Sequence, residues 1–270
     1  MTSPGHEALN RESDSASGPA DYSEEIRRQR EVWLNKPVLR ALYNRWYSQC
    51  ATFFSSQRPV VEIGAGSGNF KSYYKNVIST DVFPSGPWID VVMDAHALAL
   101  APNMIGNVIV FDVLHHLQRP LDFLRRAIAS IKPGGRLVVC EPALSPWSRF
   151  VYGNFHHEPI DDKWDLFGLD GKPPEEDRLH EFANAAIPEL LFWKNRATTV
   201  QLLAPSRLVH AQKFGFLLYP LTGGFGYRSY VPSTGFATLQ KIEDQIMRPF
   251  AGWLTGMRMI VVFEKPMHLY

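Results

Sequence analysis

The stretch Val60–Gly68 reads VVEIGAGSG, in which an apolar run holding one acid leads directly into three alternating glycines. An apolar run of this length bounded by glycine predicts a buried strand that ends in a tight turn. Glycine accepts a positive φ and has no Cβ to hold a ligand away from the backbone. A helix beginning after the turn would point free N–H groups into the same space, where they favour an anionic group. The stretch therefore predicts a nucleotide-like ligand.

The glycine spacing separates two classes of nucleotide site. The dinucleotide fingerprint Gly-x-Gly-x-x-Gly could begin at Gly64 and Gly66, but it would then need glycine at position 69, where the chain has Asn69. The third glycine comes one residue early, at Gly68, and Glu62 lies two residues before the first. This Glu-x-Gly-x-Gly-x-Gly form resembles the first motif of the class I S-adenosylmethionine (SAM)-dependent methyltransferases.

The next two segments follow in the order that this family shows. Residues 77–81 predict a second strand ending in Asp81, whose carboxylate could accept both ribose hydroxyls. A dehydrogenase would use an acid there in the same way, so this residue alone does not discriminate. Residues 89–96 predict a third strand followed by the pair Asp94-Ala95. In the family this pair lies against the adenine ring, which favours SAM over a dinucleotide.

The resemblance continues to a fifth strand. Residues 107–117, NVIVFDVLHHL, resemble the family's fourth strand and the turn after it. Proline is tolerated in a first helical turn, so a helix is predicted to begin at Pro120, with apolar residues at helical spacing as far as Ile131. The segment 132–135 ends that helix, and residues 137–142 predict the fifth strand.

The resemblance is closest to the small-molecule branch of the family, in which Leu-His-His-Leu after the fourth strand is common. It implies an α/β fold: a Rossmann-like, seven-stranded, mostly parallel sheet with helices on both faces, an antiparallel last strand between strands five and six, and a lid insertion. The implied reaction is methyl transfer from SAM, with S-adenosylhomocysteine as product. Glu62 would hold the methionine amino group, and Asp112 would lie near the methionine moiety. The cofactor-binding residues that the resemblance implies are Glu62, Gly64, Ala65, Gly66, Gly68, Asp81, Val82, Asp94, Ala95, Asp112 and Val113.

The composition disfavours several other functions. The 270 residues include 28 basic and 27 acidic side chains, a net charge of +1 that gives no general attraction to nucleic acid. Two cysteines make no disulfide framework. The N-terminus lacks the pattern of a signal peptide, and no apolar run approaches membrane-spanning length. We expect a cytoplasmic enzyme with no nucleic-acid partner and no stable membrane insertion, although peripheral contact with a membrane would fit.

The chain divides by composition into a tail and one SAM-dependent methyltransferase domain. Residues 1–22 are rich in small and polar residues and predict a disordered tail. The domain, 23–270, would contain N-terminal helices (23–56), a SAM-binding core (57–142), a substrate and lid insertion (143–204) and a C-terminal part (205–270). In that last part the pattern predicts a helix over 205–213, a sixth strand over 216–219, an amphipathic helix before 256 and a last strand over 257–264.

Histidines near the predicted site could supply a general base. An acceptor hydroxyl is activated by such a base, whereas an acidic or already nucleophilic atom can do without one. His115 follows the fourth strand, while His156 and His157 lie early in the insertion, where Glu158 or Asp161 could orient them. Adjacent histidines without a second His/Cys cluster predict no metal.

Other aromatic and basic residues could line the acceptor site. Tyr227 and Arg228 would suit a carboxylate, phosphate or sugar, and Tyr43 and Tyr47 are the N-terminal aromatics best placed to reach the pocket. The predicted function is O-methylation of a small molecule, in a secondary-metabolite or cell-envelope sugar or lipid pathway. An NAD(P)-dependent oxidoreductase and a non-catalytic SAM-binding protein are the alternatives.

Overall fold

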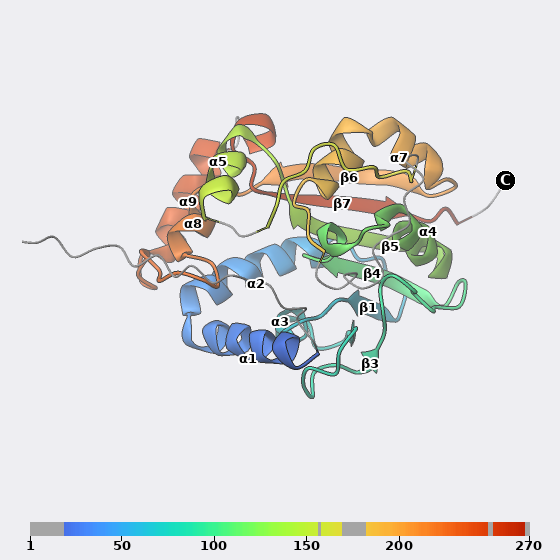
Figure 1. Cartoon of the computed structure of the whole chain (residues 1–270), viewed down its shortest axis with the longest axis horizontal. Coiled ribbons are helices and arrows are strands. Elements are labelled where there is room, and N and C mark those ends of the chain that lie inside the picture. The colour runs from blue at the N-terminus through green and yellow to red at the C-terminus, as the bar shows by residue number, and fades with distance from the viewer. Residues whose placement is uncertain (1–18, 156–157, 169–181, 248–250, 268–270) are drawn as a thin grey trace, which may run out of the picture.

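The protein is built on one seven-stranded sheet in the order β3-β2-β1-β4-β5-β7-β6 (Figure 1). The computed structural model describes residues 19–155, 158–168, 182–247 and 251–267. The strands are β1 Val60–Ile63, β2 Ile78–Asp81, β3 Val91–Val92, β4 Ile105–Phe111, β5 Ile131–Pro142, β6 Arg207–Phe214 and β7 Arg258–Glu264. The helices and helical turns are α1 Pro19–Asn35, α2 Pro37–Ala51, α3 Asn69–Tyr73, η1 Leu114–His116, α4 Pro120–Ser130, α5 Pro146–Phe155, α6 Ile187–Glu189, η3 Leu190–Lys194, α7 Arg196–Leu202, α8 Leu218–Thr222, α9 Phe236–Met247 and η4 Ala251–Thr255.

The sheet is parallel except for β7. Strands β1 to β5 run parallel to their neighbours, and β7 pairs antiparallel with both β5 and β6. This confirms the predicted fold class, including the place of the last strand. Because the parallel strands all end at one edge, the residues that follow β1, β2, β3, β4 and β5 gather there.

Apolar side chains alternate between two faces of the sheet, as the period of a strand requires. In β4, Val108 and Val110 belong to the cluster that α4, α5 and α6 cover, whereas Ile109 and Phe111 belong to the cluster that α2, α8 and α9 cover. Since both faces are covered, the central strands are continuous apolar runs. The strands in the N-terminal half of the chain could be predicted from sequence for this reason.

Three boundaries differ from the predictions. The helix α1 begins at Pro19, so the last four residues of the predicted tail are helical, while residues 1–18 lie outside the described part of the chain. The third strand is only Val91–Val92, at the exposed edge of the sheet. The fourth helix ends at Ser130, and Ile131 opens β5, where it pairs with Ile105 of β4.

The prediction for the chain after residue 204 was wrong in two elements. Residues 207–214 form the edge strand β6 rather than a helix, and residues 218–222 form the helix α8 rather than a strand. The strand β6 is half-exposed, interrupted by an irregularity between Leu208 and His210, and paired only with β7. Its conformation is therefore set by a partner fifty residues away, which local spacing does not report.

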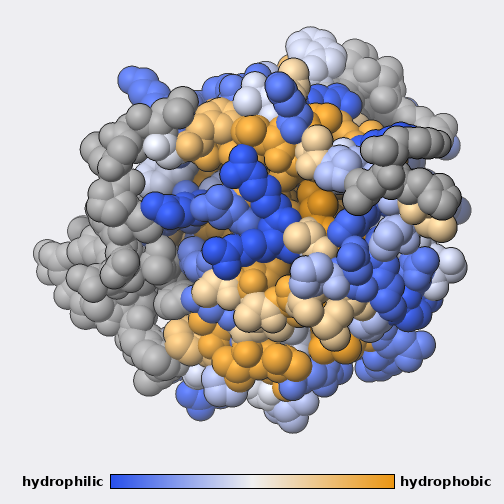
Figure 2. Space-filling view, turned by 90° about the vertical axis from the view of Figure 1, so that its right-hand side faces the viewer, coloured by the Kyte–Doolittle hydropathy of each residue, from blue (hydrophilic) through white to orange (hydrophobic). Residues whose placement is uncertain are grey.

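The surface over α4 and α7 mixes polar and apolar residues. In Figure 2, which looks onto that side of the molecule, hydrophilic residues run across the middle between more hydrophobic areas. Among the described residues, every helix is too short or too polar to cross a membrane.

Candidate active site

The three glycines form the turn between β1 and α3, and all three have positive φ: 70° at Gly64, 50° at Gly66 and 70° at Gly68. Other residues reach this region only with strain. A Cβ on Gly64 would lie 2.4 Å from a methyl of Val113, and one on Gly68 would lie 2.4 Å from the ring of Trp88. A Cβ on Gly66 would make an ordinary contact of 3.7 Å with Ile26 of α1, so at this position it is the positive φ that requires glycine.

Asp81, at the end of β2, holds this turn in place. Its carboxylate accepts a hydrogen bond of 2.7 Å from the backbone N–H of Gly66 and one of 3.2 Å from the hydroxyl of Tyr22 on α1. Burial raises the pKa of Asp81, while these and other donors oppose the shift. The acid stands where the resemblance places a ribose ligand, with Val82 directly after it.

The helix α1 lies across the same turn. Arg30 donates a 2.8 Å hydrogen bond to the carbonyl of Ser67, and its guanidinium stacks 4.7 Å from the ring of Trp88. Trp88 in turn donates to the carbonyl of Gly66. Neither Tyr22 nor Arg30 carries a motif, which is why sequence reasoning missed both.

Glu62, in β1, is an acid buried in the sheet. Only 3% of the residue is exposed, and one carboxylate oxygen accepts a 2.9 Å hydrogen bond from the hydroxyl of Ser79. Burial raises the pKa of Glu62 to about 7, although the bond from Ser79 opposes the shift. A buried acid on the verge of ionising is suited to a cationic ligand such as an amino group.

The other two predicted cofactor acids also follow strands of the parallel set. Asp94, with Ala95 after it, follows β3 and accepts from the backbone N–H of His96 at 2.8 Å. Asp112 follows β4 with a φ of 57°, and its carboxylate lies 2.6 Å from the guanidinium of Arg258. Burial raises the pKa of Asp112, and the charge of Arg258 opposes that shift.

Arg258 is an unforeseen member of the site. It opens β7, is only 4% exposed, and its guanidinium lies 5.0 Å from the ring of Trp46 and 4.8 Å from that of Phe111. The aromatic cluster beside it includes Tyr43 and Tyr47, which are both buried. The sequence feature that could have identified Arg258 is its position as a charged residue at the start of an apolar strand.

Glu141, at the end of β5, orients His115. One of its oxygens accepts the backbone N–H groups of Val113 and Leu114, at 2.9 and 2.8 Å. The other lies 2.5 Å from Nδ1 of His115. Burial alone would lower the pKa of His115, but Glu141 and Glu158 outweigh it and raise that pKa well above the usual range. Sequence reasoning missed Glu141, although its place after a buried strand was a usable signal.

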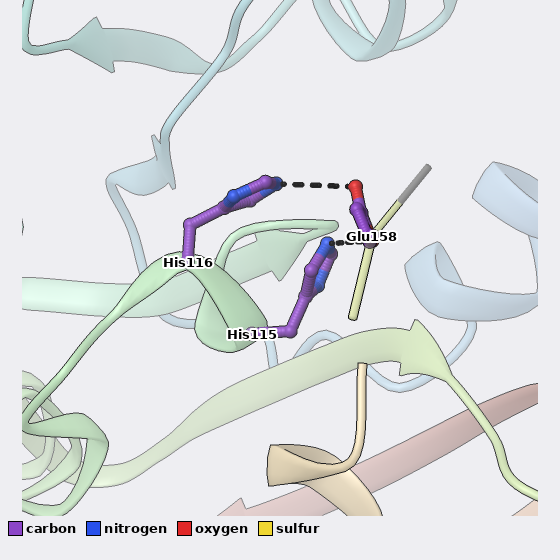
Figure 3. A group of neighbouring side chains, drawn as sticks. All are labelled: His115, His116 and Glu158. Carbon is purple, nitrogen blue, oxygen red and sulfur yellow. Dashed lines mark ion pairs between the residues drawn. The ribbon is translucent and has the colours of Figure 1, made fainter. Parts of the chain in front are cut away.

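His115, His116 and Glu158 face one another at this edge of the sheet (Figure 3). Nε2 of His115 lies 3.3 Å from one carboxylate oxygen of Glu158, and Nε2 of His116 lies 3.8 Å from the other. Nδ1 of His116 is 3.1 Å from the carbonyl of Phe182. Burial and the charge of His115 lower the pKa of His116 to about 4. The segment after α5 therefore contributes Glu158 to a cluster of His115, His116 and Glu158, whose two histidines lie in the turn after β4.

The remaining predicted residues lie elsewhere or outside the described chain. His156 and His157 are outside the described residues. The carboxylate of Asp161 accepts from the backbone N–H of Lys163, in a local turn. Tyr227 is 55% exposed, and the guanidinium of Arg228 lies over the ring of Tyr230. The structure shows no contact that joins Asp161, Tyr227 or Arg228 to the cluster among the parts described.

Comparisons with known proteins agree with the fold. A family model described as a methyltransferase domain matches residues 34–211. One similar structure is a SAM-dependent methyltransferase of Thermotoga maritima, a possible histamine N-methyltransferase, with 15% identity over 90% of this chain and 98% of that one, at a TM-score of 0.53. Another is the Haemonchus contortus phosphoethanolamine N-methyltransferase 2, which is 10% identical. The match covers 93% of this chain and 61% of that one, at a TM-score of 0.50. No protein of curated function matches the sequence significantly. Since the family model covers well over half of the sequence, the chain belongs to the methyltransferase domain family and is a class I SAM-dependent methyltransferase.

Proposed function

We propose that this enzyme transfers the methyl group of SAM to a hydroxyl group of a small molecule. The observation that carries the proposal is the series Glu141, His115 and Glu158, of which His115 lies in the turn directly after the predicted cofactor residues Asp112 and Val113. A hydroxyl must lose a proton as it is methylated, and this is the step for which a positioned acid–base group is useful.

The cofactor site is suited to SAM on the evidence of its own residues. By the resemblance, Glu62 would accept the ammonium of the methionine moiety, and Asp81 would accept the ribose hydroxyls in place of the hydroxyl of Tyr22. The three positive-φ glycines form the turn beside Asp81. When bound, SAM supplies an electrophilic methyl group on a cationic sulfur, so the protein mainly has to align the acceptor and handle its proton.

The cluster can take up that proton without accumulating positive charge. A protonated His115 lies between two carboxylates, which gives the series a net charge of −1. Glu158 has 23% of its side chain exposed, whereas those of His115 and Glu141 are almost fully buried. Glu158 is therefore the member that an acceptor can reach, and His115 and Glu141 position it.

An apolar cavity supports an acceptor with an apolar or aromatic part. It has a volume of about 520 Å³ and lies between α5 and the segment before β7, lined by Pro146, Trp147, Phe150, Phe216, Leu254 and Thr255. Pro146, Trp147 and Phe150 belong to α5, the helix that comes before Glu158 in the sequence.

Release of S-adenosylhomocysteine tests the proposal. The enzyme is incubated with SAM and matched acceptors that carry either a hydroxyl or an amine on the same apolar ring. We expect turnover with the hydroxyl series, and the variant Glu158→Gln should lower kcat by about 10²- to 10⁴-fold, the usual contribution of a general base. Binding of S-adenosylhomocysteine by the variant should equal that of the wild type. Turnover restricted to amines, or a fully active variant, would contradict the proposal.

A further inference from the structure

The side chains of His115, His116 and Glu158 face one another closely enough to bind a single ion. Their ligand atoms all lie within 4.8 Å of one another. We propose that these three side chains bind one divalent cation of the first transition series, for which Zn²⁺ is the best chemical match. The proposal rests on the proposed function only for the consequence of binding, since the site itself is argued from geometry.

The separations between the groups are those of metal ligands. A histidine nitrogen and a carboxylate oxygen share a hydrogen bond at about 2.7–3.2 Å. Nε2 of His115 and Nε2 of His116 lie 3.3 and 3.8 Å from the two oxygens of Glu158. Ligands about 2.0–2.1 Å from a tetrahedral Zn²⁺ stand about 3.4 Å apart. Two imidazoles and one carboxylate also form a well-known set of protein ligands for this ion that leaves a position open.

Both imidazoles are held by acceptors on their far side. Nδ1 of His115 lies 2.5 Å from Glu141, and Nδ1 of His116 lies 3.1 Å from the carbonyl of Phe182. Once an ion has displaced the proton from Nε2 of His115, each ring would keep its proton on Nδ1 and direct the lone pair of Nε2 to the ion beside Glu158. Metal-binding histidines nearly always have such a carboxylate or carbonyl partner, which fixes the tautomer and the orientation of the ring.

The turn η1 explains how two adjacent histidines can serve one ion. Successive side chains of a strand point to opposite faces, but the tight turn Leu114–His116 brings these two rings to a centroid distance of 4.1 Å. Glu141 fixes the turn by accepting its first backbone N–H groups. When the cation replaces the proton on Nε2 of His115, both imidazoles are neutral, and the two negative charges of Glu158 and Glu141 are balanced by the divalent cation.

A second group of neighbouring donors, Asp112, His115 and Glu141, is less suited to a cation. Asp112 is already paired with Arg258, and Glu141 accepts two backbone N–H groups and faces Nδ1 of His115. These contacts would have to be broken to free the ligands, whereas the group with Glu158 keeps them all.

A cation at this site would activate the proposed acceptor. A hydroxyl bound to its open position would have a lowered pKa, and because Glu158 would then be a ligand rather than the base, the proton would pass to solvent. The oxygen lone pair would then form the bond to the methyl carbon as the bond from carbon to sulfur breaks, and the electron pair would stay on sulfur. The chemistry favours a hydroxyl beside a second oxygen, because two oxygens could occupy neighbouring positions of the ion.

Metal binding can be measured without SAM or any acceptor. The full-length protein is stripped with a chelator and titrated with Zn²⁺ by calorimetry, and with Co²⁺ by absorption, since tetrahedral Co²⁺ has distinctive visible bands. We expect one ion per chain and visible bands from the cobalt form. The variants His116→Gln and Glu158→Gln should each weaken Zn²⁺ binding at least tenfold and abolish the bands.

Matched controls separate the cluster from other donors. His210→Gln on β6 and Asp165→Asn in the insertion remove a histidine and an acid outside the cluster and should leave binding unchanged. Asp165→Asn keeps a side-chain oxygen to accept from the backbone N–H of Phe167. The double variant His156→Gln/His157→Gln should also bind normally.

Three outcomes would overturn the metal site. They are no stoichiometric binding by the wild type, equal binding by Glu158→Gln, and binding lost only in the His156→Gln/His157→Gln variant. None of them bears on the proposed function, which fails separately if metal-bound enzyme shows no turnover with hydroxyl acceptors. Thermal unfolding and S-adenosylhomocysteine binding of each variant show that it is folded, so a lost metal is not mistaken for a lost fold.

Discussion

Glu62 links a single residue to the pH dependence of the whole protein. Burial raises its pKa to about 7 in the folded chain, from the ordinary value of 4.5 for a glutamate. The folded state thus holds the proton more tightly than the unfolded state. This contribution to stability is complete below pH 4.5 and is lost as the pH rises through 7. Above that range the buried carboxylate is a cost that a bound cationic group would offset.

The variant Glu62→Gln should remove this dependence. Because one pKa unit corresponds to about 1.4 kcal/mol, the wild type should lose about 2 kcal/mol between pH 5 and pH 8 relative to the variant. Urea unfolding of both proteins without cofactor gives the difference at each pH, and all other titrating groups cancel in the comparison. Unfolding free energies that stay parallel over this range would contradict the shift.

For single residues, the sequence predicted which residues lie at the ends of the strands better than it predicted their hydrogen-bond and ion-pair partners. Glu62, the three glycines and Asp81 could be predicted because each is next to a strand whose end the pattern marks. Glu141 and Arg258 could not be assigned roles, because their contacts join the ends of β5 and β7 to the turn after β4. Such pairings depend on sheet order, which no local pattern of residues contains.

At the scale of whole elements, the structure adds most to the role of the helix α1, which contacts the glycine turn. It fastens itself to the glycine turn through Arg30, which bonds to Ser67 and stacks on Trp88, and through Tyr22, which bonds to Asp81. Its helical state was predictable from sequence, but the contacts of Tyr22 with Asp81 and of Arg30 with Ser67 were not. The edge strand β6 shows the same limit, since its conformation comes from pairing with β7 rather than from its own residues.

We expect Arg30→Ala to loosen α1. Losing a charge-assisted hydrogen bond and a stacking contact should lower the unfolding free energy by about 1–2 kcal/mol. Amide exchange should quicken across the helix and at residues 66–68. Arg28→Ala is the matched control on the same helix, because Arg28 forms only an exposed pair with Glu25 at 3.7 Å, and such pairs contribute little. Equal exchange in the two variants would show that Arg30 does not fasten the helix.

At the scale of the whole molecule, one edge of the sheet collects parts of the chain that are far apart in sequence. The N-terminal helix α1, the turn after β4, the insertion and the head of β7 all meet there. The ion pair between the half-buried Asp112 and the buried Arg258 joins two of these parts, the end of β4 and the start of β7. We therefore expect the ion pair to couple the stability of the turn after β4 to that of β7, although these two segments are far apart in sequence.

A double-mutant cycle measures that coupling. Arg258→Met keeps the bulk of the side chain between Trp46 and Phe111 but leaves Asp112 without its ion pair. Removing one partner of a buried pair costs about 3–5 kcal/mol, and we expect the lower end because 30% of the Asp112 side chain is exposed. Asp112→Asn in the same chain should recover part of this loss, so the double variant should be more stable than the sum of the single changes predicts by about 1–3 kcal/mol. Urea unfolding of the four proteins gives the value. If the effects of the two changes are simply additive, the ion pair contributes no coupling energy. The attachment of β7 to the rest of the sheet would then depend on its pairing with β5 and β6 rather than on this ion pair.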